Sequence, residues 1–178
     1  MIFITWNCQG AASREVLRAL KEIKKTYKPD LLGLLETKVS GSKADEICNR
    51  LGFDEWLRVE ALGFSGGIWV FWNSTLDIKP LLTHPQFVLL HVQGLDCTTC
   101  FISIVYGSPT HALRKNLWNS LDMHDLQIRG PWLVAGDFNA VISPEEVSEP
   151  RNFSHSRSTG FRDWIFNQNL IDLGFQGS

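Results

Sequence analysis

The stretch Trp132-Leu133-Val134-Ala135-Gly136-Asp137-Phe138-Asn139 decides how the rest of the chain is interpreted. The apolar residues that follow Pro131 predict a short buried strand, which breaks at Gly136. Asp137 and Asn139 come next, two positions apart, and in extended backbone such side chains point the same way. Open α/β sheets place their chemistry at the carboxyl ends of strands, so we expect both side chains to face one site. The structural alternative is a capping Asp and a turn Asn after an ordinary core strand.

Other predicted strands also end in polar side chains. They are Asn7 after the predicted strand at 1–6, Glu36 after the apolar run at 31–35, and Tyr106 at the carboxyl end of the predicted strand at 101–106. The first two runs flank a helix, and a right-handed β-α-β crossover brings Asn7 and Glu36 to the same edge of the sheet. Each residue alone has an ordinary interpretation, as a turn Asn, a solvated loop Glu and a Tyr that closes the core. Several strands that end alike favour a common site.

Hydrophobic periodicity predicts the remaining elements. Helices are expected from the N-cap Ser13 to before Pro29, from the cap Ser42 to Gly52, over 110–126, and from the cap Ser158 onward. Further strands are expected at 55–61, 68–72, 76–82 and 87–93, with one more beginning at Leu170. Short connections indicate an antiparallel meander, and Gly66-Gly67 marks a tight turn or a close backbone approach. Trp69 and Trp72 could stack on bases, but alternation along a strand favours the core.

Composition excludes several classes of protein. The 178 residues, 44% hydrophobic and 20% charged, fit one soluble globular domain, and the net charge of −2 lacks the basic excess of a dedicated nucleic-acid binder. Cys97 and Cys100 form the closest cysteine pair, but zinc would need a second such pair and a redox motif should open a helix. We expect a turn there. No signal peptide and no apolar run of membrane-spanning length is apparent, which predicts an intracellular protein without a membrane anchor.

The strand-end residues share a chemistry. They supply carboxylate, carboxamide and phenol oxygens, without His or Cys. Hard oxygen ligands suit Mg²⁺ or Mn²⁺ rather than zinc. A cation held by one or two carboxylates is a common arrangement for handling phosphate esters.

The same motifs resemble those of the endonuclease/exonuclease/phosphatase superfamily, which includes exonuclease III-like abasic-site nucleases and deoxyribonuclease I. The similar stretches are Trp6-Asn7, Leu35-Glu36-Thr37, Tyr106-Gly107-Ser108-Pro109 and Gly136-Asp137-Phe138-Asn139. Asn7-Cys8-Gln9-Gly10 and the stretch at 66–72 look most like plant LINE-type non-LTR retrotransposon endonuclease domains. The similarity covers essentially the whole chain. It implies a DNase I-like, four-layer α/β sandwich of two mixed β-sheets flanked by helices.

The resemblance also implies a role for each residue. Glu36 would bind the divalent cation, Mg²⁺ or Mn²⁺, with Asn7 beside it. Tyr106 would donate a hydrogen bond to a phosphate oxygen. Asp137 would orient and activate the attacking water, with Asn139 helping to hold the water or the phosphate. These roles amount to charge neutralisation, positioning and general-base assistance.

The family pattern continues beyond these motifs, with an Asp on a later strand and an Asp-His pair near the carboxyl end. The sequence stops at Ser178 before either could appear, and His124 precedes Asp125 in the wrong order. We therefore expect residues 1–178 to form one domain that is incomplete at its C-terminus and lacks its last strands. Losing one such catalytic group commonly costs about two to four kcal/mol of transition-state stabilisation, so we expect weak or no turnover.

Three functions fit this pattern. The first is a divalent-metal-dependent DNA endonuclease of retroelement type, acting as a monomer on DNA, for which a nuclear location is compatible. The second is a phosphatase or a lipid phosphodiesterase of the same superfamily. The third is an inactive truncated remnant that at most binds metal or nucleic acid. The LINE-like stretches favour the endonuclease.

Overall fold

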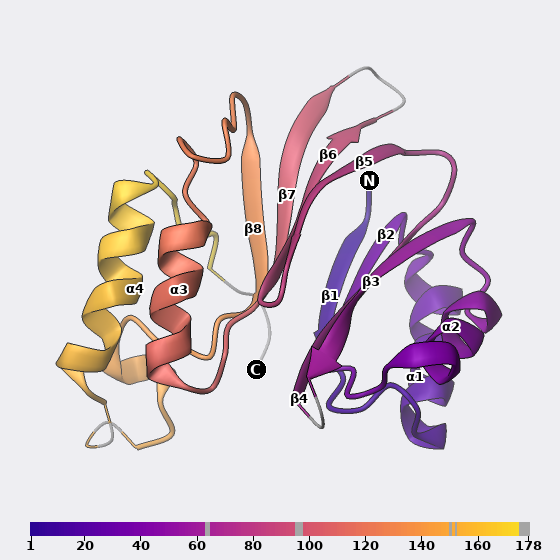
Figure 1. Ribbon diagram of the computed structural model, residues 1–178, viewed down its shortest axis with the longest axis horizontal. Coiled ribbons are helices and arrows are strands. Elements are labelled where there is room, and N and C mark those ends of the chain that lie inside the picture. Colours follow the sequence, from indigo (N-terminus) through magenta and orange to yellow (C-terminus); the bar gives the residue numbers. More distant parts are fainter. Residues whose placement is uncertain (63–64, 95–97, 150, 152, 175–178) are drawn as a thin grey trace. The chain divides into compact units, whose positions relative to one another are not determined.

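Figure 1 shows the protein as a computed structural model, which describes residues 1–62, 65–94, 98–149, 151 and 153–174 of the chain. The chain divides into two compact units. The first unit holds Met1–Ser108 and Arg129–Phe138, and the second holds Pro109–Ile128 and Asn139–Ser178. Both sheets lie in the first unit, and each unit is described by itself.

The first sheet has the strand order β1-β2-β4-β3. Its strands are β1 (Phe3–Asn7), β2 (Leu31–Leu35), β3 (Glu55–Leu62) and β4 (Ser65–Trp72). β1 runs parallel to β2, and both partners of β4 are antiparallel to it, so the sheet is mixed. The parallel pair confirms the predicted β-α-β unit.

The second sheet has the strand order β5-β6-β7-β8. Its strands are β5 (Asp77–His84), β6 (Phe87–Gln93), β7 (Thr99–Tyr106) and β8 (Trp132–Asp137). β7 and β8 are parallel and the other pairs are antiparallel. The predicted single meander is wrong, because β4 and β5 belong to different sheets despite their short connection.

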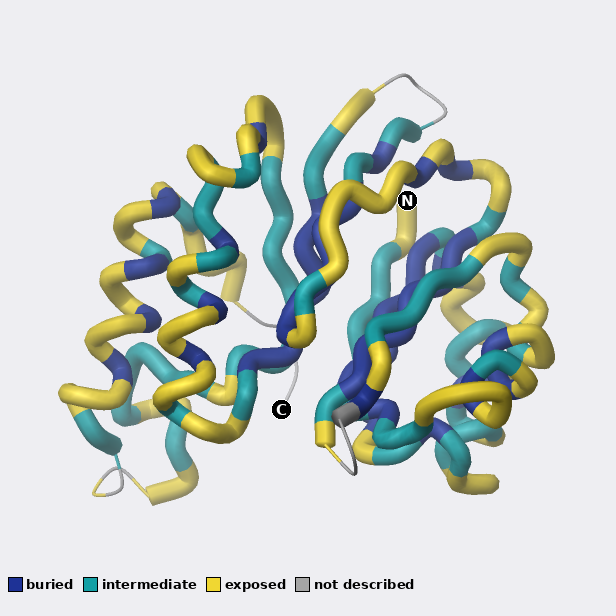
Figure 2. Tube along the Cα trace, in the orientation of Figure 1, coloured by how far each residue is buried: buried dark blue, intermediate teal, exposed yellow. Residues whose placement is uncertain are grey.

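The core explains why β2 is apolar throughout. Alternate side chains of a strand point to opposite faces. Leu31 and Leu35 share one buried cluster with residues of the second sheet, whereas Leu32 and Leu34 share another with the helices α1 and α2. A Cβ on Gly33 would lie 2.9 Å from Ile104 of β7, so glycine lets the sheets approach closely. Figure 2 shows the resulting buried strands in dark blue.

Two helices of the first unit follow their sequence signals in part. α1 spans Arg14–Tyr27, and its N-cap Ser13 accepts a hydrogen bond from the Val16 amide at 3.1 Å, as predicted. Tyr27, the last residue of α1, is 57% exposed. α2 spans Gly41–Arg50 and begins after Ser40 rather than at the predicted cap Ser42. The Ser40 hydroxyl instead bonds the Ala61 carbonyl at 3.1 Å, a tertiary contact that fixes the start of the helix.

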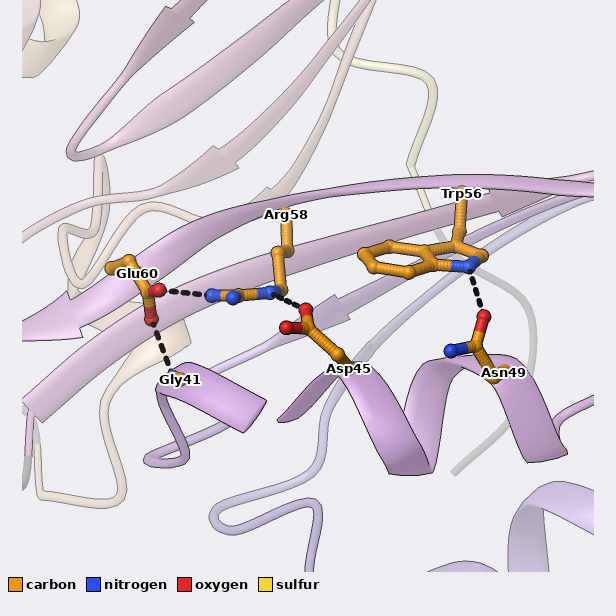
Figure 3. A network of polar contacts seen from close by, with 6 residues as sticks. All are labelled: Gly41, Asp45, Asn49, Trp56, Arg58 and Glu60. Carbon is orange, nitrogen blue, oxygen red and sulfur yellow. Dashed lines mark hydrogen bonds and ion pairs between the residues drawn. The ribbon is translucent and has the colours of Figure 1, made fainter. Parts of the chain in front are cut away.

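Polar contacts tie α2 to β3 (Figure 3). The Arg58 guanidinium pairs with Asp45 at 2.7 Å and also with Glu60. Glu60 accepts from the Gly41 amide at 3.4 Å. The Trp56 indole donates to Asn49 at 3.1 Å. These contacts hold the outer helix on its strand.

The second unit contains α3 (His111–Ser120), the 3₁₀ turn η1 (Pro144–Glu146) and α4 (His155–Asn167). α3 ends before the predicted residue 126, because the Asp122 carboxylate caps the amides of His124 and Asp125 in a turn. α4 begins after Ser154. The predicted cap Ser158 is instead buried inside the helix and donates to main-chain carbonyls of the preceding turn.

Aromatic side chains join α3 to α4. The Trp118 ring stacks on Phe161 at 5.0 Å between centroids, and the Trp164 indole donates to the Leu121 carbonyl at 2.6 Å. Residues 170–174 form no strand in this structure, contrary to prediction. Cys97 lies outside the described residues.

The two tryptophans of β4 are core residues. Trp69 is fully buried and Trp72 is 7% exposed, which confirms the core interpretation. Across the described ranges, no helix is long and apolar enough to cross a membrane.

Candidate active site

The polar strand ends of both sheets meet within the first unit. Strand register places Asn7 opposite Leu35, next to Glu36, and places Tyr106 opposite Asp137. The Asn7 carboxamide donates to the Asp137 carboxylate at 2.5 Å, across the two sheets. Four side chains predicted from separate strand ends therefore converge: Asn7, Glu36, Tyr106 and Asp137.

Asn7 has an oxygen that the surrounding side chains do not satisfy. Its Nδ2 donates to Asp137, whereas its Oδ1 is buried and has no hydrogen-bond partner among the described residues. A buried acceptor without a partner costs free energy unless something binds it. An amide oxygen beside two carboxylates fits a hard divalent cation.

Glu36 is held in an unusual backbone conformation. Its φ of +56° lies in the left-handed region, which non-glycine residues seldom adopt. The next two amides, of Thr37 and Lys38, donate to the carbonyls of Gly67 and Gly66 at 3.4 and 3.1 Å. The Glu36 carboxylate, 18% exposed, pairs with the Lys38 ammonium at 3.2 Å. Such strained residues persist where their surroundings fix them, often at functional sites.

The predicted close approach at Gly66-Gly67 is confirmed. Gly67 has a φ of +89°, and a Cβ there would lie 2.3 Å from the Thr37 hydroxyl oxygen. A Cβ on Gly66 would lie 3.7 Å from the Tyr106 ring. The glycine pair therefore lets β4 contact both the Glu36 loop and Tyr106.

Tyr106 is a buried phenol among carboxylates. Burial, which is the largest cause, and the negative charges of Glu36 and Asp137 together raise the pKa of Tyr106 to about 12. A side-chain hydrogen bond also links it to Glu36. Tyr106 therefore keeps its proton at neutral pH and can donate a hydrogen bond to an anionic group.

Gly136 brings Asp137 to its place beside β7. Its φ is +144°, and a Cβ would lie 2.0 Å from the Val105 carbonyl oxygen, which no larger residue tolerates. The Gly107 amide then donates to the Asp137 carbonyl at 2.7 Å. The main chains of the Tyr106 and Asp137 strands are thereby joined at their ends.

Asn139 does not follow the geometry first expected. β8 ends at Asp137, and Asn139 has a φ of +48° and belongs to the second unit. The backbone is therefore not extended through Asn139, and the extended alternation predicted for Asp137 and Asn139 does not hold. A functional role of Asn139 rests on the motif alone.

Residues that sequence patterns missed also shape this site. Lys38 pairs with Glu36, and Gln86 bonds the end of β7. Nothing in their local sequence marks them, because their partners come from the fold. Within the ranges that the structure describes, no three His, Cys, Asp or Glu residues gather as a metal-binding group, so the oxygen donors here are two carboxylates and an amide.

Two mixed sheets packed face to face, with oxygen-rich strand ends meeting at one edge, define a DNase I-like fold. The chain belongs to the Endonuclease/Exonuclease/phosphatase family, whose model matches residues 4–173. This confirms the superfamily indicated by the motifs, and the predicted fold class of two mixed sheets flanked by helices is also confirmed.

Solved structures share this fold at low sequence identity. An AP endonuclease from Leishmania major is 18% identical, with a TM-score of 0.68 over 94% of this chain and 66% of that one. A 3′ phosphatase from Neisseria, bound to a product DNA hairpin, is 17% identical, with a TM-score of 0.66 over 94% and 69%. An AP endonuclease from Archaeoglobus fulgidus is 17% identical, with a TM-score of 0.64 over 93% and 70%. The chain thus spans about two thirds of the length of these proteins. A comparison with curated proteins found no match.

Proposed function

We propose that the protein is a divalent-metal-dependent phosphodiester hydrolase, a DNA endonuclease of retroelement type. Family membership supports a hydrolase that acts on phosphate esters. The DNA substrate is supported by the Neisseria relative, whose structure contains a DNA hairpin. The retroelement type is supported by the plant LINE-like stretches around Asn7 and Gly66-Gly67.

The observation that carries the proposal is the 2.5 Å hydrogen bond between Asn7 and Asp137. It joins residues 130 positions apart in sequence and brings the polar ends of both sheets together. Tyr106 interacts with the charges of Glu36 and Asp137 from the same edge. Few purely structural needs would place two carboxylates, a carboxamide and a buried phenol at one point.

Glu36 and Asn7 are the residues proposed to hold the cation. The unsatisfied Oδ1 of Asn7 and the partly buried carboxylate of Glu36 offer oxygen ligands of the kind that Mg²⁺ or Mn²⁺ prefers. A bound cation would neutralise charge on the phosphate. Lys38 supplies positive charge beside the same carboxylate.

The remaining residues act on the water and the phosphate. Asp137 orients the attacking water and accepts its proton, while its other contact, from the Asn7 amide, fixes the carboxylate. Tyr106, protonated at neutral pH, donates a hydrogen bond to a phosphate oxygen. Asn139 is proposed to help hold the water or the phosphate.

A phosphatase is the second candidate, because the Neisseria relative is described as a 3′ phosphatase. The two functions differ in substrate rather than in the residues required. An endonuclease nicks closed circular DNA, whereas a phosphatase needs a terminal phosphate. We propose weak turnover for these 178 residues, because they offer no counterpart to the family's Asp-His pair.

The test is Mg²⁺-dependent nicking of supercoiled plasmid at high protein concentration. We expect slow nicking that EDTA and the Asp137→Ala substitution both abolish. Asp77→Ala, at an exposed position at the start of β5, is the matched control and should nick like the wild type. No nicking by protein shown to be folded by circular dichroism would overturn the proposal and favour an inactive remnant. Release of phosphate from a 3′-phosphorylated oligonucleotide without nicking would favour the phosphatase.

A further inference from the structure

The turn between β5 and β6 reaches the end of β7, where Tyr106 lies. Phe87 is opposite Val105 in the antiparallel ladder, which brings Gln86 beside Tyr106. The main-chain carbonyl of Gln86 accepts from the Tyr106 amide at 2.8 Å. Its side-chain Oε1 accepts from the Ser108 amide at 2.7 Å. One glutamine therefore bonds the residues on both sides of Gly107.

These bonds complete the backbone accounting at the end of β7. The Gly107 amide donates to the Asp137 carbonyl at 2.7 Å, on the opposite side from Gln86. Three consecutive amides, at 106, 107 and 108, are thus taken by Gln86, Asp137 and Gln86 again. The Gln86 side-chain carbonyl takes the place of a main-chain acceptor for the Ser108 amide, beyond the last paired residues of β6 and β7. It extends the ordered part of β7 past Tyr106.

Gln86 is itself well fixed. It is 9% exposed, so little water competes for its side-chain hydrogen bond. Its main-chain N–H donates to His84 Nδ1 at 3.2 Å, and the His84 ring stacks on Phe87 at 4.8 Å between centroids. Burying a carboxamide side chain costs free energy unless its polar atoms form hydrogen bonds. The bond from the Ser108 amide offsets that cost for the Gln86 carbonyl oxygen. The main-chain and side-chain carbonyls of Gln86 both accept hydrogen bonds from the Tyr106–Ser108 segment.

We propose that Gln86 is a positioning residue of the candidate active site, and that its side-chain carbonyl sets the orientation of Tyr106 by holding Ser108. The proposal rests on the proposed function for the role of Tyr106. A phenol that must meet a phosphate oxygen needs its strand end fixed to within a fraction of an ångström, and a misplacement of about 1 Å can cost up to about 100-fold in rate. Gln86 provides that restraint from outside the reacting groups.

Two substitutions separate this role from simple packing. Gln86→Met keeps the length and approximate volume of the side chain but removes the strong acceptor for the Ser108 amide. Gln86→Glu keeps an acceptor oxygen at the same reach. Gln93→Met is the matched control, because Gln93 is a half-buried glutamine at the far end of β6, the strand that begins directly after Gln86. Gln86→Ala is a second variant should Gln86→Met not fold.

The readout is NMR of protein labelled at the tyrosine ring carbon that carries the hydroxyl. The chain has two tyrosines, and the exposed Tyr27 serves as an internal reference for the Tyr106 signal. We expect Gln86→Met to shift the Tyr106 signal, to speed hydrogen exchange of the Ser108 amide, and to leave Tyr27 unchanged. Gln86→Glu should restore both properties, and Gln93→Met should change neither.

The nicking rate provides the link to function. We expect Gln86→Met to reduce single-turnover nicking by up to about 100-fold, with Gln86→Glu recovering most of it. An unchanged Tyr106 signal in Gln86→Met, or an equal change in Gln93→Met, would overturn the role of Gln86. If the wild-type protein does not nick DNA, the proposed function fails, while the NMR signals still decide whether Gln86 orients Tyr106.

Discussion

Replacing Asn7 by Asp tests the geometry that joins the two sheets. The substitution preserves shape but puts a second carboxylate oxygen where the Asn7 Nδ2 now lies, 2.5 Å from Asp137. At an effective dielectric constant of about 20, two unit charges at that separation repel by about 7 kcal/mol. Both groups cannot ionise at that distance, so the pair would keep one proton between them.

The expected effect depends on pH with a definite sign. The pair would have one pKa raised above the unfolded value of about 3.9, because the second negative charge is resisted in the folded state. The variant is therefore penalised least at acid pH, and its free energy of unfolding falls as pH rises through the raised pKa. If rotation of the side chains relieves about half of the repulsion, the added loss between pH 4 and pH 8 is about 3 kcal/mol.

Urea unfolding of the wild type, Asn7→Asp and Asn7→Leu at pH 4 to 8 measures this loss. Asn7→Leu has a similar volume and no charge, and it removes the hydrogen bond to Asp137. We therefore expect its free energy of unfolding to fall by the same amount at every pH. Adding Mg²⁺ should recover part of the loss in Asn7→Asp at pH 8, since a cation relieves the repulsion. If Asn7→Asp and Asn7→Leu show the same pH-independent destabilisation, the two side chains are not in contact and the convergence of strand ends is refuted.

Other predictions follow from single contacts. Lys38→Met removes the ammonium group that lies 3.2 Å from the Glu36 carboxylate and competes with a metal ion for it. We therefore expect calorimetry to show several-fold tighter Mn²⁺ binding. Weaker binding would mean that Lys38 mainly holds the carboxylate in place. Burial lowers the pKa of His84, so the unfolded chain binds the proton more readily than the folded one, and the free energy of unfolding should decline as pH falls below about 6.5. In urea unfolding, His84→Leu should reduce this dependence on pH. An unchanged dependence would mean that another group causes it. Arg58→Met should lower the free energy of unfolding by about 1 kcal/mol, whereas Arg50→Met, at an exposed pair, should have a much smaller effect; equal effects would contradict the role of the contacts in Figure 3.

The strands were the most predictable part of the fold, for a physical reason. β2 is apolar at every position because both of its faces are buried, one against the second sheet and one against helices. Such a run needs no tertiary information to be recognised. The positions of the candidate site residues at strand ends were predictable for a related reason, because each interrupts an apolar run there: Asn7, Glu36, Tyr106 and Asp137.

The allocation of strands to sheets was not predictable from connection length. The link from β4 to β5 is short, yet its residues are tied elsewhere: the Asn73 amide bonds the Asp30 carbonyl at 3.2 Å, and the Ser74 amide bonds Asp54 at 2.7 Å. These contacts direct the chain away from a hairpin. They join segments far apart in sequence, which a local pattern does not contain.

Two of the helix starts were predicted wrongly for a similar reason. Ser42 and Ser158 satisfy the composition rule for caps, but the helices begin earlier, after Ser40 and Ser154. Neither of these two caps accepts a side-chain hydrogen bond from its own helix, and Ser40 bonds β3 instead. Where tertiary contacts replace the local cap, the sequence signal points to the wrong serine. The contacts of Gln86 and Lys38 could not be predicted from sequence for the same reason, because the fold brings their partners near them.

We propose that the strand ends of both sheets form one cation-dependent site. Titration with Mn²⁺ of protein labelled at the hydroxyl-bearing tyrosine carbons tests it directly, because Mn²⁺ broadens nearby signals whether or not turnover is fast. We predict that the Tyr106 signal broadens at low Mn²⁺ while the Tyr27 signal does not, and that Mg²⁺ competes. Glu36→Gln should abolish the broadening. Equal broadening of both tyrosines, or broadening of Tyr106 that survives Glu36→Gln, would contradict the account.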